Sequence, residues 1–194
     1  MTISLGGKYE AGKGPDEAGE VVTREDLGNF EHLRKLLATL KLEAQYEVIP
    51  PTGIVNLNRD NHIVVCGPRL SPIIAQVLEG DDNLRFQKDR AWHLVDLKTQ
   101  EVYRSPMDED ASAGDVGYLA RLPRLDGKGT FIYVAGIHSI GANGVVHYLE
   151  NHLAELYRDV RTHRFSTLIS CRYDPKTLAI LESKRVSPIY RHEA

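Results

Sequence analysis

The chain reads HIVVCGPRLSP over residues 62–72 and FIYVAGIHSIGANG over residues 131–144. Each stretch opens with a short, continuous apolar run, which is typical of a strand covered on both faces of a sheet. A glycine-bearing loop and the beginning of a helical pattern follow each run. This order predicts an open α/β sheet, in which ligands bind in the crevice at the carboxyl ends of the strands.

Further strand patterns occur between and after these two segments, with too few helical patterns to separate them. Apolar runs and alternations predict strands over residues 84–87, 92–96, 101–104, 116–122, 130–135, 166–173 and 178–186. Polar turns inside residues 92–104 and 166–186 indicate two hairpins. A regular doubly wound sheet needs a helix between successive strands. We therefore predict an α/β fold with a Rossmann-like mixed sheet, flanking helices and added antiparallel hairpins.

The chain is expected to consist of three parts. Residues 1–22 are rich in glycine and charge and are predicted to be a flexible N-terminal segment. Residues 23–60 are predicted to form an amphipathic helix and a linker, in which Pro50 and Pro51 exclude a helix. The compact Rossmann-like α/β domain is expected over residues 61–194.

The helix of the second part has clear local signals. Thr23 is a favourable N-cap, and Glu25 and Asp26 suit the first turn. One face of the helix carries an apolar stripe. That stripe must cover either the sheet of the same chain or the same helix of a second copy, and the second alternative predicts a homodimer through this helix. Apolar residues recur at helical spacing at Leu27, Phe30, Leu33, Leu36, Leu37 and Leu40.

Composition and charge argue against several functional classes. The formal net charge is −3 and the isoelectric point is near 6.2, which disfavours a nucleic-acid binder. No apolar stretch approaches the roughly 20 residues that span a bilayer, and the N-terminus lacks the apolar core of a signal peptide. Cys66 and Cys171 fall in or beside predicted core strands, which suits reduced thiols. We therefore expect a cytoplasmic protein without membrane contact.

The first glycine loop offers groups for an anion but no complete cofactor motif. It lacks the G-x-G-x-x-G spacing of dinucleotide-binding domains and the lysine–serine pair of P-loops, so no cofactor is predicted. Gly67 permits close backbone approach, and Arg69 suits a phosphate or carboxylate. Pro68 lies between them, and Ser71 caps the following helix. The alternative is a strand-to-helix turn with a solvated arginine.

The second glycine loop repeats this arrangement after a strand of the same kind. Gly136 and Gly141 allow positive φ angles, and His138, Ser139 and Asn143 are hydrogen-bond donors for a ligand. The alternative is a glycine-rich turn that lets the following helix pack tightly on the sheet. That helix carries an apolar stripe of Val145, Leu149, Leu153, Leu156 and Val160.

Three residues near the predicted crevice are candidate catalytic groups. Cys66 and His138 would form a nucleophile–base pair, although a buried, inert thiol is the commoner state of such a cysteine. Asp115 is the candidate carboxylate for cleavage of an N-glycosidic bond, where the developing positive charge needs a nearby anion. Its alternative role is that of a strand-edge residue. The eight histidines show no metal-ligand spacing, so no metal site is predicted.

Several motifs resemble a domain of actinobacterial proteins. They are VVCGPRLSP at 64–72, WHLVD at 92–96, YRSPMD at 103–108, AGIH at 135–138, GVVHYLE at 144–150 and RFSTL at 164–168. The resemblance covers about residues 61–191, and the domain it points to often follows a helix-turn-helix in proteins labelled as regulators. It implies a ligand-sensing or effector module in bacterial regulation or defence. The single N-terminal helix of this chain cannot form a two-helix DNA reader.

The sequence therefore supports three functional hypotheses. The first is a sensing module that binds a nucleotide or other small anion at the two glycine loops. The second is an enzyme in the same crevice that cleaves an N-glycosidic or ester bond of a nucleotide, and the residues leave open whether the chain is an enzyme. The third is a protein-interaction module that dimerises through the N-terminal helix.

Overall fold

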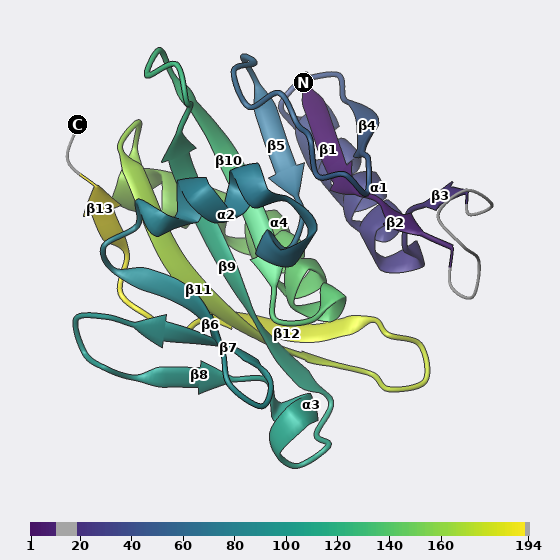
Figure 1. Cartoon of the computed structure of the whole chain (residues 1–194), viewed down its shortest axis with the longest axis vertical. Helices are drawn as coiled ribbons and strands as arrows, with labels where there is room; N and C mark the ends of the chain where they lie inside the picture. The colour runs from purple at the N-terminus through teal and green to yellow at the C-terminus, as the bar shows by residue number, and fades with distance from the viewer. Residues whose placement is uncertain (11–18, 193–194) are drawn as a thin grey trace.

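The computed structural model describes residues 1–10 and 19–192, and Figure 1 shows their arrangement around one large sheet. Its strands lie in the order β12-β11-β9-β10-β5-β1-β4, with β13 next to β11. β5 is parallel to β1 and β10, and β1 is parallel to β4, whereas β9, β11 and β12 pair antiparallel. The bounds are β1 (Thr2–Gly6), β4 (Gln45–Ile49), β5 (His62–Val65), β9 (Gly114–Pro123), β10 (Thr130–Gly136), β11 (Arg164–Tyr173), β12 (Ile180–Arg185) and β13 (Tyr190–His192).

Different elements cover the two faces of this sheet. α1 (Arg24–Thr39) and α4 (Ser139–Val160) pack on one face. α2 (Pro72–Glu79) and a small antiparallel sheet pack on the other (Figure 1). The small sheet consists of β6 (Leu84–Lys88), β7 (Trp92–Asp96) and β8 (Val102–Arg104). Shorter elements are the hairpin of β2 (Lys8–Tyr9) and β3 (Glu20–Val21), the 3₁₀ helix η1 (Pro68–Leu70) and α3 (Pro106–Glu109).

β5 is covered on both faces, as its continuous apolar sequence predicts. Ile63 and Val65 belong to the core that contains residues of α1 and α4, whereas Val64 belongs to the core with α2 and the small sheet. Alternate residues of a strand point to opposite faces, so a strand buried on both faces must be apolar throughout. The predicted fold class, an α/β mixed sheet with flanking helices and antiparallel hairpins, is confirmed.

The N-terminal region differs from our expectation of a flexible segment over residues 1–22. β1 lies between β5 and β4, and Ile3 and Leu5 are fully buried. β4 comes from the expected linker, so the sheet includes chain from before residue 61. The expectation failed because two alternating apolar residues are too short a pattern to stand out from the glycine- and charge-rich sequence that follows. Residues 11–18 fall under the same prediction and lie outside the described residues.

α1 begins where the sequence predicts. The N–H of Asp26 donates to the Thr23 hydroxyl at 3.1 Å, which caps the first turn. Phe30, Leu33 and Leu37 are buried in the core with α4 and the sheet. The apolar stripe therefore covers the sheet of the same chain, and a homodimer through this helix stays a prediction.

The connections create a topological switch point between β1 and β5. From β1 the chain crosses one face through α1 and returns as β4, on the far side of β1. From β5 it continues into α2 on the opposite face. The carboxyl ends of β1, β5 and β10 therefore meet at one edge of the sheet, where open α/β sheets bind their ligands.

The burial of β1 in the sheet can be tested with Leu5→Ala. Because this side chain is fully buried, its truncation is expected to lower the free energy of unfolding by about 3 kcal/mol, measured by urea denaturation. Leu181→Ala is the matched control, since that leucine is 60% exposed, and it is expected to change stability by less than about 0.5 kcal/mol. Equal effects of the two substitutions would contradict a buried β1.

Candidate functional site

A narrow crevice opens at the carboxyl ends of β1, β5 and β10. Its walls come from the segment after β1, the first turn of α1, and the loops that follow β5 and β10. Its volume is about 40 Å³, space for about three water molecules or a group of similar size. The lining includes Lys8, Asp26, Cys66, Gly67, Pro68, Arg69, Gly136, His138 and Ser139, with Phe86 and Trp92 from the small sheet.

Both glycine loops contribute residues to this lining. The first loop contributes residues 67–69, and the second contributes Gly136, His138 and Ser139. A Cβ on Gly136 would lie 2.0 Å from the His138 carbonyl oxygen, so the turn between β10 and α4 requires a glycine. The structure thus brings six of the nine residues that we assigned to ligand binding into one crevice, and their role in binding stays a prediction.

Ser71 and Gly141, two others of that set, contribute to packing and do not line the crevice. Ser71 is fully buried, donates to the Gly53 carbonyl oxygen at 2.6 Å and accepts from the N–H of Ile74 at 3.4 Å. A Cβ on Gly141 would lie 2.6 Å from Asp115 Oδ2. The glycine therefore lets α4 approach β9 closely.

Asn143 lies on a different side of α4 from the crevice. Successive residues of a helix are turned by about 100°. Ala142 consequently lines the crevice, whereas Asn143 lines a second cavity between α1, α4 and the turn after β11. Asn143 therefore does not line the anion site, although we expected it there from its position in the second glycine loop.

Positive charge gathers at the crevice from side chains and helices. Arg69 is exposed on η1, and Lys8 follows β1. Within residues 1–10 and 19–192, neither side chain forms an ion pair with a carboxylate. The first turns of α1 and α4 both contribute residues to the lining, and the first N–H groups of a helix have no acceptor within the helix. The crevice therefore favours an anionic group.

Asp26 supplies a carboxylate to the same wall. It is 8% exposed, and its Oδ2 accepts the hydroxyl hydrogen of Thr23 at 2.7 Å. Burial raises the pKa of Asp26, while the hydrogen bond from Thr23 and the charge of Lys8 oppose that rise. Asp26 therefore belongs to the helix cap and to the crevice at the same time.

Sequence reasoning misses Lys8 and Asp26 as site residues because it does not recognise β1. The signal is present, since LGGK over residues 5–8 repeats the order of strand, glycine loop and later helix. A Cβ on Gly7 would lie 2.5 Å from the Ile49 carbonyl oxygen, so this loop also needs a glycine to pass the end of β4. The crevice thus has a third glycine-bearing loop.

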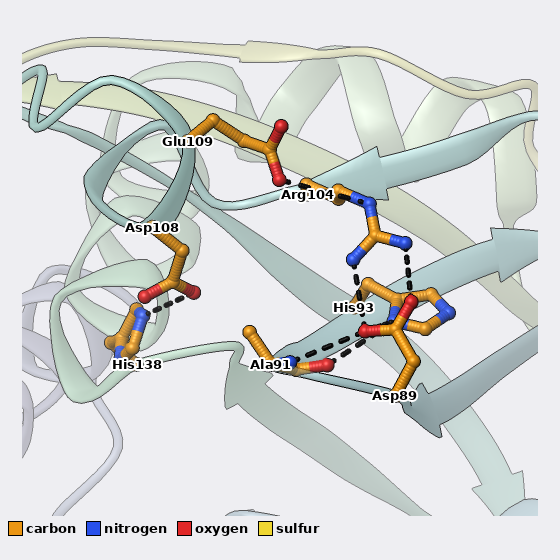
Figure 2. A network of polar contacts seen from close by, with 7 residues as sticks. All are labelled: Asp89, Ala91, His93, Arg104, Asp108, Glu109 and His138. Carbon is orange, nitrogen blue, oxygen red and sulfur yellow. Dashed lines mark hydrogen bonds and ion pairs between the residues drawn. The ribbon is translucent and has the colours of Figure 1, made fainter.

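His138 connects the crevice to α3. Figure 2 shows its side chain directed at Asp108 of α3, with Nε2 2.9 Å from Oδ2. Arg104 belongs to the small sheet, and its Nε lies 3.7 Å from Oε1 of Glu109 in α3 (Figure 2). Its Nη2 lies 2.5 Å from Oδ2 of Asp89. The hydrogen bond from Arg104 lowers the pKa of Asp89. Polar contacts therefore hold α3 between the second glycine loop and the small sheet.

Asp115 lies beneath the second glycine loop and outside the crevice lining. It is fully buried, and its Oδ2 accepts the backbone N–H of His138 at 2.9 Å. Its Oδ1 has no hydrogen-bond partner among the described residues. Burial raises the pKa of Asp115 to about 6. The carboxyl group positions the loop and has no surface toward a ligand, which disagrees with the catalytic role that we considered.

Cys66 lines the base of the crevice as a buried thiol. Burial raises its pKa to about 12, and its Sγ lies 3.4 Å from the Gly67 carbonyl oxygen. Nucleophilic catalysis needs the thiolate, and a thiol with this pKa stays protonated near neutral pH. The structure therefore favours the inert thiol over the nucleophile–base pair of Cys66 and His138.

The described residues contain no group of three or more His, Cys, Asp or Glu side chains arranged to hold a metal ion. They also contain no helix with the length and apolar character needed to cross a bilayer. Comparison with models of protein families, with curated proteins and with solved structures gives no significant match.

Asp115→Asn tests the role of the buried carboxyl group through the pH dependence of stability. The folded chain binds this proton more tightly than the unfolded chain, because the pKa is about 6 rather than 3.8. The wild-type free energy of unfolding should therefore fall as pH rises from about 4 to 6, and the asparagine variant lacks this contribution. We expect the variant to gain on the order of 3 kcal/mol relative to wild type across this range. Parallel stability curves in urea denaturation would contradict the assignment.

Proposed function

We propose that this chain is a sensing module that binds a nucleotide or a related small anion in the crevice at the ends of β1, β5 and β10. The observation that carries the proposal is the meeting of Arg69, Lys8 and the first turns of α1 and α4 around one crevice. Cationic side chains and helix N-termini are the usual groups with which proteins bind phosphates and carboxylates.

Other lining groups favour an anion that also carries hydroxyl groups and an aromatic ring. A carboxylate such as Asp26 accepts hydrogen bonds and suits a sugar hydroxyl. Phe86 and Trp92 offer apolar, aromatic surface for a base. A nucleotide supplies the charge, the hydroxyl groups and the ring, whereas inorganic phosphate supplies only the charge.

The size of the crevice limits how such a ligand binds. A volume of about 40 Å³ admits a phosphate-sized group and not a whole nucleotide. We therefore expect the phosphate to occupy the crevice between Arg69 and Ser139, and the sugar and base to lie at its open side near Trp92.

Two observations support a sensing role for this site. A ligand that touches His138 competes with Asp108 for the imidazole, so binding is coupled to the position of α3 (Figure 2). The motifs over about residues 61–191 resemble a domain of bacterial regulatory proteins. We propose on this basis that the chain acts in the cytoplasm of a bacterium, in a regulatory or defence system, and that a partner detects the movement of α3.

Nucleotide binding can be tested by thermal shift with AMP, ATP, cyclic AMP and NAD, and with inorganic phosphate as the control ligand. A nucleotide at 100 times its Kd stabilises the fold by about 2.7 kcal/mol, which is a shift of about 5–10 °C for a chain of this size. Arg69→Ala is expected to weaken binding about 10- to 100-fold, because it removes a charge-assisted hydrogen bond. Arg172→Ala is the matched control, since that side chain is 72% exposed and pairs with Glu182 on β12. Equal affinities of the two variants would contradict the site.

A second candidate function is hydrolysis of the N-glycosidic bond of a nucleotide. The observation that favours it is Asp26, a carboxyl group in the crevice whose pKa is raised by burial. Such a group protonates a leaving base or stabilises the positive charge that develops on the sugar. Asp26 replaces Asp115 as the acidic residue of this hypothesis, because Asp115 does not line the crevice.

Asp26→Asn separates binding from hydrolysis. If the chain is a hydrolase, the variant should still bind nucleotides and should release free base at least about 100-fold more slowly, measured by chromatography. If wild type releases no base from any nucleotide that it binds, the enzyme hypothesis is wrong and the sensing module stands. Thr23→Ser, which keeps the hydroxyl donor to Asp26, is the control for the stability of the helix cap.

A further inference from the structure

An apolar groove lies on the α1 and α4 face of the sheet, toward the carboxyl ends of the two helices. Residues within 33–40 and 149–160 form its walls, and side chains of β5, β9, β10 and β11 form its floor. Its volume is about 160 Å³. The crevice is lined by the first turns of the same helices and shares no residue with the groove. The two are therefore separate places in the fold.

The apolar stripes of α1 and α4 are only partly covered along this groove. Leu36 of α1 and Leu153 of α4 are partly buried. Leu40 and Tyr157 are 51% and 52% exposed. All four residues line the groove. Adjoining apolar surface that the fold leaves open is typical of ligand-binding grooves and interaction sites.

Arg121 places a cation on the floor of this groove. Leu119 lies two residues earlier in β9 and belongs to the core with α1 and α4, so Arg121 points to the same face of the sheet. Its partners in the neighbouring strands are Ile132 of β10 and Phe165 of β11, which are both apolar. In the lining that the described residues form, Arg121 is the one charged side chain.

Only part of the Arg121 guanidinium group is hydrogen-bonded. Its Nη1 donates to the carbonyl oxygens of Arg161 at 2.7 Å and His163 at 3.4 Å, just after α4. Nε and Nη2 form no hydrogen bond with the described residues, and neither atom is fully buried. Within residues 1–10 and 19–192, no carboxylate pairs with this arginine. The guanidinium group therefore has an accessible edge with two free donors.

We propose that the groove binds a medium-chain carboxylate, with the alkyl tail between α1 and α4 and the head group on Arg121. An apolar cavity of about 150 Å³ holds benzene, so a volume of 160 Å³ has room for a tail of about six carbon atoms. The N–H groups of Nε and Nη2 form a fork that matches the two oxygens of a carboxylate. This site does not depend on the anion site, because the two share no residue.

A second copy of the chain fits the groove less well than a carboxylate does. In a twofold dimer the same surface of each copy meets itself. The guanidinium group of Arg161 lies 5.6 Å from the ring centroid of Tyr157 at the groove, so such a dimer would bring Arg121 and Arg161 of both copies together. The lining formed by the described residues has no acidic side chain to pair with these cations. A carboxylate supplies both the apolar surface and the negative charge.

The groove can be tested by NMR titration of the full chain, with ¹³C-labelled methyl groups, using butyrate, hexanoate, octanoate and decanoate below their micellar concentrations. The methyl signals of Leu36, Ile132 and Leu153 should shift, because these residues line the groove. Affinity should rise about fourfold for each methylene group from butyrate to octanoate, because each one buries apolar surface. It should level off between octanoate and decanoate, because the tail then exceeds the groove.

Arg121→Gln tests the position of the head group. This variant should bind octanoate about 10- to 100-fold more weakly, because the charge-assisted hydrogen bonds are lost. It should bind 1-octanol, which has a similar tail and no charge, as tightly as wild type does. The comparison separates recognition of the carboxylate from the structural contacts of Arg121 with residues 161 and 163.

Leu153→Glu tests the groove while leaving Arg121 in place. It puts a negative charge on the apolar wall and should weaken octanoate binding at least about tenfold, because the tail loses apolar contact and the head group meets a like charge. Because Leu153 is only partly buried, the variant is expected to fold. Ala154→Glu is the matched control, since it adds the same charge at an exposed position of α4 and should bind as wild type does.

Five results would overturn this site. The first is the absence of shifts at Leu36, Ile132 and Leu153, and the second is shifts confined to crevice methyl groups such as those of Ile137. The third is an affinity that keeps rising to decanoate or is unchanged in Leu153→Glu, which would show non-specific adsorption. The fourth is an equal loss of octanoate and 1-octanol binding in Arg121→Gln. The fifth is a dimer, detected by light scattering, whose formation shifts the same methyl signals without any probe.

Discussion

The crevice depends on the parallel pairing of β5 with β1 on one side and with β10 on the other. Parallel strands end at the same edge, so three loops leave the sheet side by side. Backbone must then pass close to backbone, because a Cβ on Gly7 would lie 2.5 Å from one carbonyl oxygen and a Cβ on Gly136 2.0 Å from another. The close approach of these loops therefore requires glycine at the strand ends, whether or not a ligand binds there.

Elements with strong local signals could be predicted from the sequence. β5 has a continuous apolar run, α4 has a long apolar stripe, and Thr23 and Ser71 cap α1 and α2 as expected. β1 could not be predicted in the same way. Its two apolar residues are part of a strand because β1 pairs with β4 and β5, which lie about 40 and 60 residues further along the chain. Pairing at that sequence separation leaves no local pattern.

The candidate site shows the same limit. The order of strand, loop and helix predicts which loops meet, and residues 67–69 and 136–139 do line one crevice. The rotation of α4 about its axis goes with tertiary packing, such as the close approach of Gly141 to Asp115 and of Gly144 to Cys171, and sequence spacing does not give that rotation. It decides that Ser139 faces the crevice while Asn143 faces the second cavity. Lys8 and Asp26 belong to the site because β1 lies beside β5 in the sheet, and that strand order could not be predicted from the sequence.

Buried polar groups are satisfied unevenly across the molecule. Away from the loop edge, the Tyr118 hydroxyl donates to Asp81 at 2.7 Å and the Tyr190 hydroxyl donates to Asp96 at 2.5 Å. In the part of the chain that the structure describes, four buried side-chain atoms are unpaired: one in the second turn of α1, one in the second turn of α4, one at the start of β9 and one in His62. The first three are Asn29 Nδ2, Asn143 Oδ1 and Asp115 Oδ1. Because an unpaired buried atom costs stability, the fold gives up stability at the end where its loops gather.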